Sequence, residues 1–322
     1  MQADYDVIQW ASLGADLDDD LARRYRVLRV WDEPELTPRV VAPARSARMA
    51  ITSVRKGFSA EAMALLPELE AVSSWGVGYD TLDIAAARER GIVVANTPGV
   101  LDDCVADMAW ALLLSAARRT AVADRYVKTG QWRTLGAFPL STRVWGKRLG
   151  ILGLGRIGQA IAERGTGFRM DVRYTNRRVV RDASYGFEPS LIALAEWADF
   201  LIVACPGGAQ TRHLVSEDVL RALGPKGILV NIARGSVVDQ AAMLRVLREG
   251  ALGGAGLDVL DDEPGAPPAL TEMDQVSLTP HMASATRETR RDMAELVARN
   301  AISFLETGEF LTPVPETVPL SG

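Results

Sequence analysis

The chain has few cysteines and few histidines. Its two cysteines, Cys104 and Cys205, lie far apart and form no C-x-x-C pair, which favours free thiols in a reducing compartment over a disulfide framework. Its two histidines, His213 and His281, show neither H-x-x-x-H spacing nor a clustered Cys/His pattern. We therefore expect no dedicated metal site.

Long apolar runs and blocks of like charge are also missing. The net charge of −5 gives no general attraction to nucleic acid or to an anionic membrane. The longest apolar run, near Ala109 to Ala117, is ended by Arg118-Arg119 too soon to span a bilayer. The first residues, Met1 to Asp6, are acidic and lack the apolar centre of a signal peptide. We expect a cytoplasmic protein with neither nucleic-acid nor membrane partners.

The 322 residues exceed what one small core needs and suit two domains. Short apolar stretches alternate with helical patterns in both halves, which favours parallel sheets covered by helices. The strands expected in the first half are Tyr5–Trp10, Arg26–Val30, Ala50–Val54, Ala71–Trp75 and Ile92–Ala95. Those expected in the second half are Leu149–Leu152, Asp171–Tyr174, Phe200–Ala204, Ile228–Ile232, Gly254–Asp258 and Val276–Thr279.

Four helices are expected from apolar spacing and end signals. Ala15–Tyr25 and Ser59–Leu66 lie between strands, with Ser59 as an N-cap. Leu101–Arg119 is small or apolar nearly all round, so we expect it to be buried between domains or against a partner subunit. Ala285–Leu305 could pack back on the first domain. The expected fold is α/β, with two doubly wound Rossmann- or flavodoxin-like domains and a cleft between them.

A glycine-rich segment, Leu149 to Ala160, combines a short apolar strand, a G-x-G-x-x-G turn and the start of an amphipathic helix. Gly153 permits the tight turn, Gly155 lets the backbone approach a pyrophosphate, and Gly158 lets helix and strand pack closely. The helix N-terminus offers free N–H groups and a partial positive charge. Such a motif is weak alone, but here it has the required context and predicts a dinucleotide site.

The next strand suggests which dinucleotide binds. An acidic residue about 20 positions after the glycines binds the ribose 2′-hydroxyl of NAD. Here the corresponding loop contains Asn176, Arg177 and Arg178 and no carboxylate. Arginines bind a 2′-phosphate with charge-assisted hydrogen bonds, so the pair favours NADP(H) over NAD(H). The alternative is that both arginines simply belong to a solvated loop end.

Three further motifs follow strands, where open α/β sheets place their ligands. They carry Arg234, Glu263 and His281. Each alone has an ordinary structural explanation. Together they supply the groups that reduction of a 2-keto acid needs: a cation that binds the carboxylate and polarises the ketone, a histidine that donates a proton, and a carboxylate that orients the histidine.

The sequence resembles the D-isomer-specific 2-hydroxyacid dehydrogenases over nearly its whole length. The resemblance is carried by Trp75-Gly76-Val77-Gly78-Tyr79-Asp80, Asn96-Thr97-Pro98-Gly99-Val100, the glycine motif, Arg234-Gly235, Asp258-Val259, Glu263-Pro264 and Pro280-His281. It implies a substrate-binding domain of residues 1–98 plus 285–322, interrupted by a dinucleotide-binding domain of residues 99–284.

The resemblance also implies residue roles. Arg234 would bind the substrate, His281 would be the acid/base and Glu263 its orienting partner. Val77 and Gly78 would hold the substrate carboxylate through their N–H groups, and Val54 would line the substrate pocket. The cofactor would be bound by the glycine turn, the arginine loop and the later strand ends, namely Gly153, Leu154, Gly155, Arg156, Ile157, Gly158, Asn176, Arg177, Arg178, Cys205, Pro206, Thr211, Ile232, Ala233, Asp258 and Ser284.

Within the family, the chain looks closest to NADPH-dependent hydroxypyruvate/glyoxylate and hydroxyphenylpyruvate reductases. It departs from the commoner pattern at Gly207-Gly208, which replaces Leu-Thr and could loosen the cofactor cleft. The resemblance implies a homodimer to which residues 101–146 contribute. The exposed-looking Trp132 and Trp145 agree with a dimer, although either could equally lie in the core.

Other functions stay open. The same fold serves as a dinucleotide-sensing corepressor, in which partner binding is the output. A formate- or phosphite-type dehydrogenase would use NAD, which the missing acidic residue disfavours. A phosphoglycerate dehydrogenase is also compatible. For the substrate, Ser53, Arg55 and Met282 are additional pocket candidates, so both small and bulky 2-keto acids remain possible.

Overall fold

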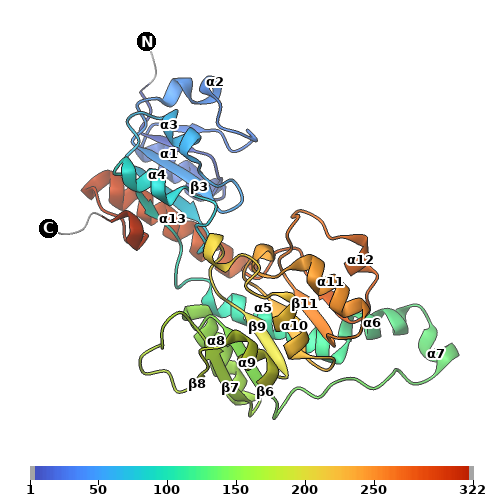
Figure 1. Ribbon diagram of the computed structural model, residues 1–322. Coiled ribbons are helices and arrows are strands. Elements are labelled where there is room, and N and C mark those ends of the chain that lie inside the picture. Colours follow the sequence, from blue (N-terminus) through green and yellow to red (C-terminus); the bar gives the residue numbers. More distant parts are fainter. Residues whose placement is uncertain (1–3, 319–322) are drawn as a thin grey trace. The chain divides into compact units, whose positions relative to one another are not determined.

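The computed structural model describes residues 4–318 and divides the chain into two compact units (Figure 1). Residues 1–101 and 286–322 form one unit, and residues 102–285 form the other. The sequence boundaries at 98/99 and 284/285 fall close to these divisions. The first three residues, which entered the expectation about a signal peptide, lie outside the described part.

The first unit is built on a parallel sheet in the order β2-β1-β3-β4-β5. Its strands are β1 (Val7–Gln9), β2 (Val27–Arg29), β3 (Met49–Ser53), β4 (Ala71–Trp75) and β5 (Val93–Ala95). This 2-1-3-4-5 order is that of flavodoxin-like folds. All five strands follow the predicted stretches, with ends that differ by up to two residues because a strand's terminal residues lack ladder partners.

Helices cover both faces of this sheet: α1 (Ala15–Arg24), α2 (Pro38–Val41), α3 (Ala60–Ala64), α4 (Ile84–Glu89) and α13 (Arg287–Thr307). Ser59 caps α3, as predicted, by accepting a hydrogen bond from the Ala62 N–H. The long α13 returns to this sheet and packs against β3, β4 and α1. Its buried side chains, including Val297 and Phe304, complete one of the unit's two apolar clusters.

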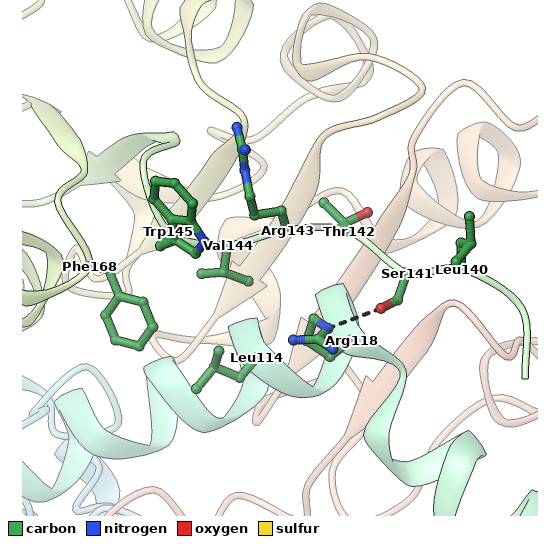
Figure 2. A pocket seen from close by; sticks show the side chains of 9 residues that line it. All are labelled: Leu114, Arg118, Leu140, Ser141, Thr142, Arg143, Val144, Trp145 and Phe168. Atoms are coloured by element: carbon green, nitrogen blue, oxygen red, sulfur yellow. Dashed lines mark hydrogen bonds between the residues drawn. The ribbon is translucent and has the colours of Figure 1, made fainter.

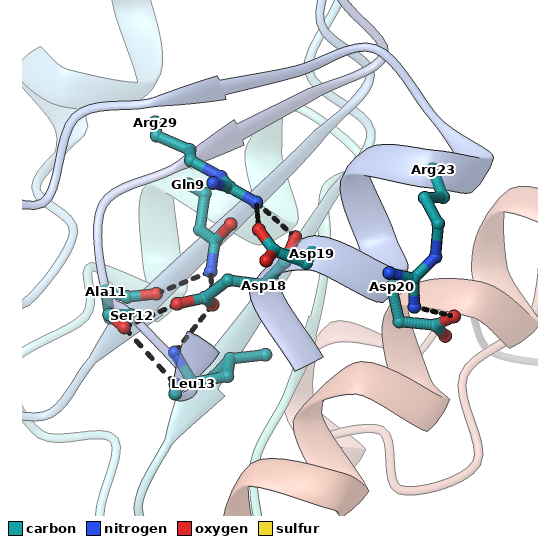
Figure 3. A network of polar contacts seen from close by, with 10 residues as sticks. Gln9, Ala11, Ser12, Leu13, Asp18, Asp19, Asp20, Arg23 and Arg29 are labelled. Atoms are coloured by element: carbon teal, nitrogen blue, oxygen red, sulfur yellow. Dashed lines mark hydrogen bonds and ion pairs between the residues drawn. The ribbon is translucent and has the colours of Figure 1, made fainter. Parts of the chain in front are cut away.

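The start of α1 is held by a buried carboxylate, Asp18 (Figure 3). Asp18 accepts hydrogen bonds from the Gln9 amide (2.5 Å), the Ser12 hydroxyl (2.5 Å) and the Leu13 N–H (2.8 Å). These donors satisfy the carboxylate inside the unit, where an unpaired charge would cost several kcal/mol. The network therefore fixes the turn between β1 and α1.

The second unit has a seven-stranded parallel sheet in the order β12-β11-β10-β9-β6-β7-β8. Its strands are β6 (Arg148–Leu152), β7 (Asp171–Thr175), β8 (Gly186–Phe187), β9 (Phe200–Val203), β10 (Ile228–Asn231), β11 (Gly254–Leu257) and β12 (Val276–Leu278). The order reverses between β6 and β9. In open α/β sheets, the carboxyl ends of the strands at such a switch point form the ligand site.

Helices of the second unit are α5 (Asp102–Arg118), α6 (Thr120–Lys128), α7 (Gln131–Leu135), α8 (Arg156–Gly167), α9 (Leu191–Trp197), α10 (Glu217–Leu223), α11 (Gln240–Arg248) and α12 (Pro268–Thr271). The structure shows a packing surface of α5 within its own unit, which the sequence did not predict. Its expected burial between domains or against a partner stays a prediction. The helix packs on β10, β11 and β12 of its own unit and on α8. A Cβ on Gly256 of β11 would lie 2.9 Å from the Leu112 Cβ, so α5 sits directly on the sheet.

The structure confirms an α/β fold with two parallel-sheet domains. The sequence missed β8, because two residues show no periodicity. Over residues 4–318, no helix has both the length and the apolar character that crossing a bilayer requires.

Candidate active site

Arg234 lies in the turn after β10, and hydrogen bonds from the side chains of Asn231 and Arg234 stabilise this turn. The strand ends at Asn231, whose side-chain Nδ2 donates to the Arg234 carbonyl (2.9 Å) and whose Oδ1 accepts from the Ala233 N–H (3.0 Å). The Arg234 guanidinium donates back to the Ala233 carbonyl (2.7 Å). Asn231 is buried, so this turn is rigidly attached to the strand end. No sequence motif indicated this role of Asn231.

His281 and Glu263 form a hydrogen-bonded pair. The Nδ1 atom of His281 lies 2.6 Å from Glu263 Oε2, and Glu263 Oε1 accepts from the Leu260 N–H at 3.0 Å. Both side chains are about one-third exposed (32% and 33%). The carboxylate thus holds one ring nitrogen of His281 and leaves the other, Nε2, available for proton transfer.

The electrostatics of this pair favour a charged Glu263. Burial opposes ionisation, but the hydrogen bonds from His281 and the Leu260 N–H and the positive charges of His281 and Arg234 outweigh it. Together they hold the pKa of Glu263 below its ordinary value of 4.5. Because the charge of Arg234 acts on Glu263, the structure brings all three predicted catalytic residues into one electrostatic environment.

Asp258 stabilises the loop of residues 279–283, which carries His281. This buried carboxylate accepts hydrogen bonds from the Thr279 hydroxyl (2.6 Å), the Met282 N–H (2.9 Å) and the Ala283 N–H (2.9 Å). The His281 N–H donates to the Asp258 backbone carbonyl at 2.8 Å. His281 itself has a φ of +50°, a strained value for a residue with a side chain. The bonds to Asp258 supply the support that this conformation needs.

Gly235 allows the arginine turn to lie against the loop that carries Glu263. A Cβ at this position would fall 2.1 Å from the Leu260 carbonyl carbon and 2.4 Å from the Asp261 nitrogen. Any larger residue would push the two backbones apart. The glycine of the Arg234-Gly235 pair therefore has a packing reason, which a single sequence does not reveal.

The glycine turn between β6 and α8 fits a bound pyrophosphate. Gly153 has a φ of +101°, and a Cβ there would lie 2.6 Å from the Cys205 nitrogen. A Cβ on Gly158 would lie 2.1 Å from the Gly153 carbonyl oxygen. Gly155 caps α8 without a side-chain hydrogen bond, and the space beside its Cα is open. The turn is thus tight where the motif requires and open at the helix N-terminus, where a phosphate binds.

The other predicted cofactor residues surround this turn at neighbouring strand ends. The Asn176 side chain accepts a hydrogen bond from the Leu154 N–H (2.8 Å), and Arg177 and Arg178 follow it on the surface. Cys205 and Pro206 follow β9, and burial raises the pKa of the Cys205 thiol to about 11, which keeps it protonated and unreactive. Thr211, Ile232, Ala233 and Ser284 lie in the loops after β9, β10 and β12, and Ile157 lies in the first turn of α8.

One predicted cofactor residue has a partner that the sequence analysis missed. The Arg156 guanidinium lies 3.4 Å from a carboxylate oxygen of Asp102, the first residue of α5. Burial raises the pKa of Asp102, while the charge of Arg156 opposes that shift. The pair joins the start of α8 to the start of α5. Sequence spacing could not reveal it, because the two residues are over 50 positions apart.

The predicted substrate residues Val54, Val77 and Gly78 belong to the first unit, in the loops after β3 and β4. Val77 is held by the Asn96 amide, which donates to its carbonyl at 2.7 Å. Gly76 has a φ of +142°, and a Cβ there would fall 2.1 Å from a methyl carbon of Val54. The two loops therefore pack against each other and keep the backbone at Val77 in one conformation.

Comparison with known proteins places these features among dehydrogenases. Residues 110–283 match the family model described as the NAD binding domain of D-isomer specific 2-hydroxyacid dehydrogenases. The chain is 42% identical over 308 residues to a glyoxylate/hydroxypyruvate reductase of Arabidopsis thaliana, covering 96% of this chain and 98% of that protein. It is 41% identical to a hydroxyphenylpyruvate reductase of Plectranthus scutellarioides, with the same coverage.

Among solved structures, an NADPH-dependent glyoxylate/hydroxypyruvate reductase from Sinorhizobium meliloti, in complex with NADP and malonate, superposes with a TM-score of 0.90. The two chains are 39% identical, and the match covers 98% of each.

Proposed function

Because this chain belongs to the D-isomer specific 2-hydroxyacid dehydrogenase family, we propose that it reduces a 2-keto acid to the D-2-hydroxy acid with NADPH. The observation that carries the proposal is the pair of His281 and Glu263, at 2.6 Å, within the electrostatic reach of Arg234. This arrangement combines a proton donor, the group that orients it and a cation for an anionic substrate.

The proposed chemistry divides between these residues. Arg234 binds the substrate carboxylate and polarises the carbonyl group. When bound, NADPH supplies a hydride to the carbonyl carbon. His281 donates the proton that the carbonyl oxygen takes up, and Glu263 stabilises the positive charge of His281 before that transfer. The products would be the 2-hydroxy acid, the oxidised cofactor and a neutral histidine, which would regain its proton from water.

For the substrate, we propose that the N–H groups of Val77 and Gly78 bind the carboxylate and that Val54 lines the pocket. Glyoxylate and hydroxypyruvate are the first candidates, because relatives similar over nearly their full length carry these names. A bulkier acid is the second candidate, since another relative at similar identity is a hydroxyphenylpyruvate reductase.

For the cofactor, we propose a preference for NADP(H) over NAD(H). Arg177 and Arg178 follow the end of β7, and within residues 4–318 no carboxylate pairs with either guanidinium. Their charge is thus free to act on a 2′-phosphate. The NADP complex of the Sinorhizobium meliloti reductase supports this preference.

We also propose a homodimer. Large apolar side chains are exposed between residues 127 and 145, including Trp132 (63%), Leu140 (100%) and Trp145 (56%). Two of these side chains, Leu140 and Trp145, also line a cavity of about 410 Å³, together with Leu114 and Phe168 among others (Figure 2). An exposed apolar area of this kind is typical of a protein–protein interface. A cytoplasmic location is supported by Cys104 and Cys205, which form no disulfide with each other.

The proposal is tested by the oxidation of NADPH and of NADH with glyoxylate, hydroxypyruvate, hydroxyphenylpyruvate and 2-ketogluconate as substrates. We expect turnover with NADPH, and a fall in kcat of about 10²–10⁴-fold in His281→Ala, the usual contribution of a general acid. As a matched control, His213→Ala removes the other histidine. Unchanged turnover in His281→Ala would contradict the proposed mechanism.

The alternatives predict different results from the same assay. A dinucleotide-sensing protein would bind NADPH and turn over none of the acids. A formate- or phosphite-type dehydrogenase would oxidise its small anion and prefer NAD. Either result would overturn the proposed reaction.

A further inference from the structure

Three loops meet beside the glycine turn of the second unit. Leu154 of the turn donates its N–H to Asn176 after β7, and Gly153 lies against the Cys205 backbone after β9. The loops after β6, β7 and β9 are thus held together by one hydrogen bond and one close backbone approach. A side chain in the loop after β9 can therefore reach the arginines in the loop after β7.

Gln210 is the side chain that does so. The Nη1 group of Arg177 donates to Gln210 Oε1 at 3.2 Å. Both side chains are exposed, and Gln210 lies in a short 3-10 helix, Ala209–Thr211. No acidic residue among residues 4–318 pairs with Arg177.

The loop that carries Gln210 is well defined despite its two glycines. Gly208 has a φ of +131°, a conformation that residues with side chains rarely adopt. The Thr211 hydroxyl donates to the Pro206 carbonyl (2.8 Å), and the Thr211 N–H donates to the Gly208 carbonyl (3.1 Å). Gly207-Gly208 therefore permits a closed turn and does not leave an open loop, so the position of Gln210 follows from the backbone.

We propose that Gln210 is a specificity-determining residue for the 2′-phosphate of the cofactor. This inference rests on the proposed use of NADPH. The amide oxygen accepts one N–H of Arg177 and orients the guanidinium, which keeps its full charge and its other N–H donors for the phosphate. A carboxylate here would bind the guanidinium in a bidentate pair, cancel its charge and repel the phosphate.

The test separates orientation from charge. Binding of adenosine 2′,5′-bisphosphate and of 5′-AMP to the full chain is measured by calorimetry for the native protein, Gln210→Glu and Gln210→Leu. The two probes differ only in the 2′-phosphate. As a matched control, Gln131→Glu adds the same charge at an exposed position on α7.

We expect Gln210→Glu to raise the Kd of the bisphosphate about tenfold and to leave that of 5′-AMP within about twofold, since only the first probe meets the lost charge. Gln210→Leu should raise the bisphosphate Kd about two- to threefold, because it removes one hydrogen bond and no charge. At higher salt, the rise in the bisphosphate Kd of Gln210→Glu should be smaller, because salt screens the added charge. Gln131→Glu should bind both probes as the native protein does.

Two outcomes would overturn the inference. The first is a Gln210→Glu variant that keeps the native ratio of the two Kd values. The second is a variant that weakens both probes equally, which would mean that Gln210 only stabilises its loop. A native protein that does not distinguish the probes would overturn the NADPH preference as well. Absence of 2-keto acid turnover, with this discrimination intact, would overturn the proposed reaction alone.

Discussion

Among single residues, Glu263 is expected to affect both activity and stability. Its carboxylate accepts from His281 and from the Leu260 N–H, and its pKa in the folded protein is lowered. A lowered pKa means that folding favours the charged form. The stabilisation from Glu263 is therefore fully present above the ordinary pKa of 4.5 and is lost as the pH falls through the lower folded-state value.

We predict that Glu263→Gln lowers kcat at least about tenfold, because an amide stabilises the charged histidine less than a carboxylate does. At pH 7 the variant should also unfold at a Tm lower by about 2–4 °C, the shift expected for about 1 kcal/mol in a domain of this size. This difference in Tm should shrink as the pH falls below 4.5 and should be lost below the lower pKa of the folded state, where the native carboxyl group is neutral. Thermal unfolding from pH 3 to pH 8 measures it.

A difference in Tm that stays constant over this range would contradict the assigned ionisation. Glu188→Gln is a suitable control: Glu188 follows β8 and accepts a hydrogen bond from the Ser190 N–H.

Among elements, the loop after β12 depends on Asp258, a side chain more than 20 positions away in the sequence. Asp258, just after β11, accepts three hydrogen bonds from residues 279–283 and so holds the strained backbone of His281. The resemblance implies that Asp258 belongs to the cofactor-binding residues. Both of its oxygens are already used by the loop, so we infer that its main contribution is to position His281.

We predict that Asp258→Asn destabilises the protein by about 2–4 kcal/mol, since one buried acceptor becomes a donor that faces N–H groups. Hydrogen exchange of the Met282 and Ala283 amides should accelerate, and kcat should fall more than KM rises. Thr279→Val removes a single bond and should cost about 1 kcal/mol. If the two amides of Asp258→Asn stay as protected as in the native protein, the positioning role is wrong.

The helices and strands also show what local patterns do and do not reveal. Each predicted strand exists, because apolar β-rich stretches between turn residues are local signals. The packing of α5 on the sheet of its own unit was not predicted, because an apolar helix surface carries no information about its partner. β8 was missed because its two residues are held only by pairing with β7.

For the whole molecule, the proposed homodimer leads to a further prediction. We predict that Trp132→Ser combined with Leu140→Ser weakens a dimer at least about a hundredfold, since each replacement removes a large apolar contact of about 1.5–3 kcal/mol. Sedimentation velocity over a range of concentrations measures this. Ile192→Ser, which changes an exposed apolar side chain on α9, should leave the assembly unchanged. A native chain that is monomeric at all concentrations would contradict the homodimer.

The local sequence was sufficient for the features whose cause lies within a few residues. A glycine turn works only between a strand and a helix, so Gly153 to Gly158 could be recognised from their neighbours alone. The arginine, glutamate and histidine were predicted as a set because parallel strands bring their carboxyl ends to one edge, whatever the packing above them. The two-domain α/β fold followed from the same alternation of strands and helices.

Only the tertiary structure decided the contacts between residues far apart in the chain. The bonds from Asp258 to the His281 loop, the close approach that Gly235 allows, the ion pair of Arg156 with Asp102 and the contact of Gln210 with Arg177 all join segments that packing brings together. Hydrogen bonds and steric contacts act over a few ångströms, and sequence separation does not encode such distances. The groups proposed to do the chemistry were therefore evident from the sequence, and those that hold them in place were not.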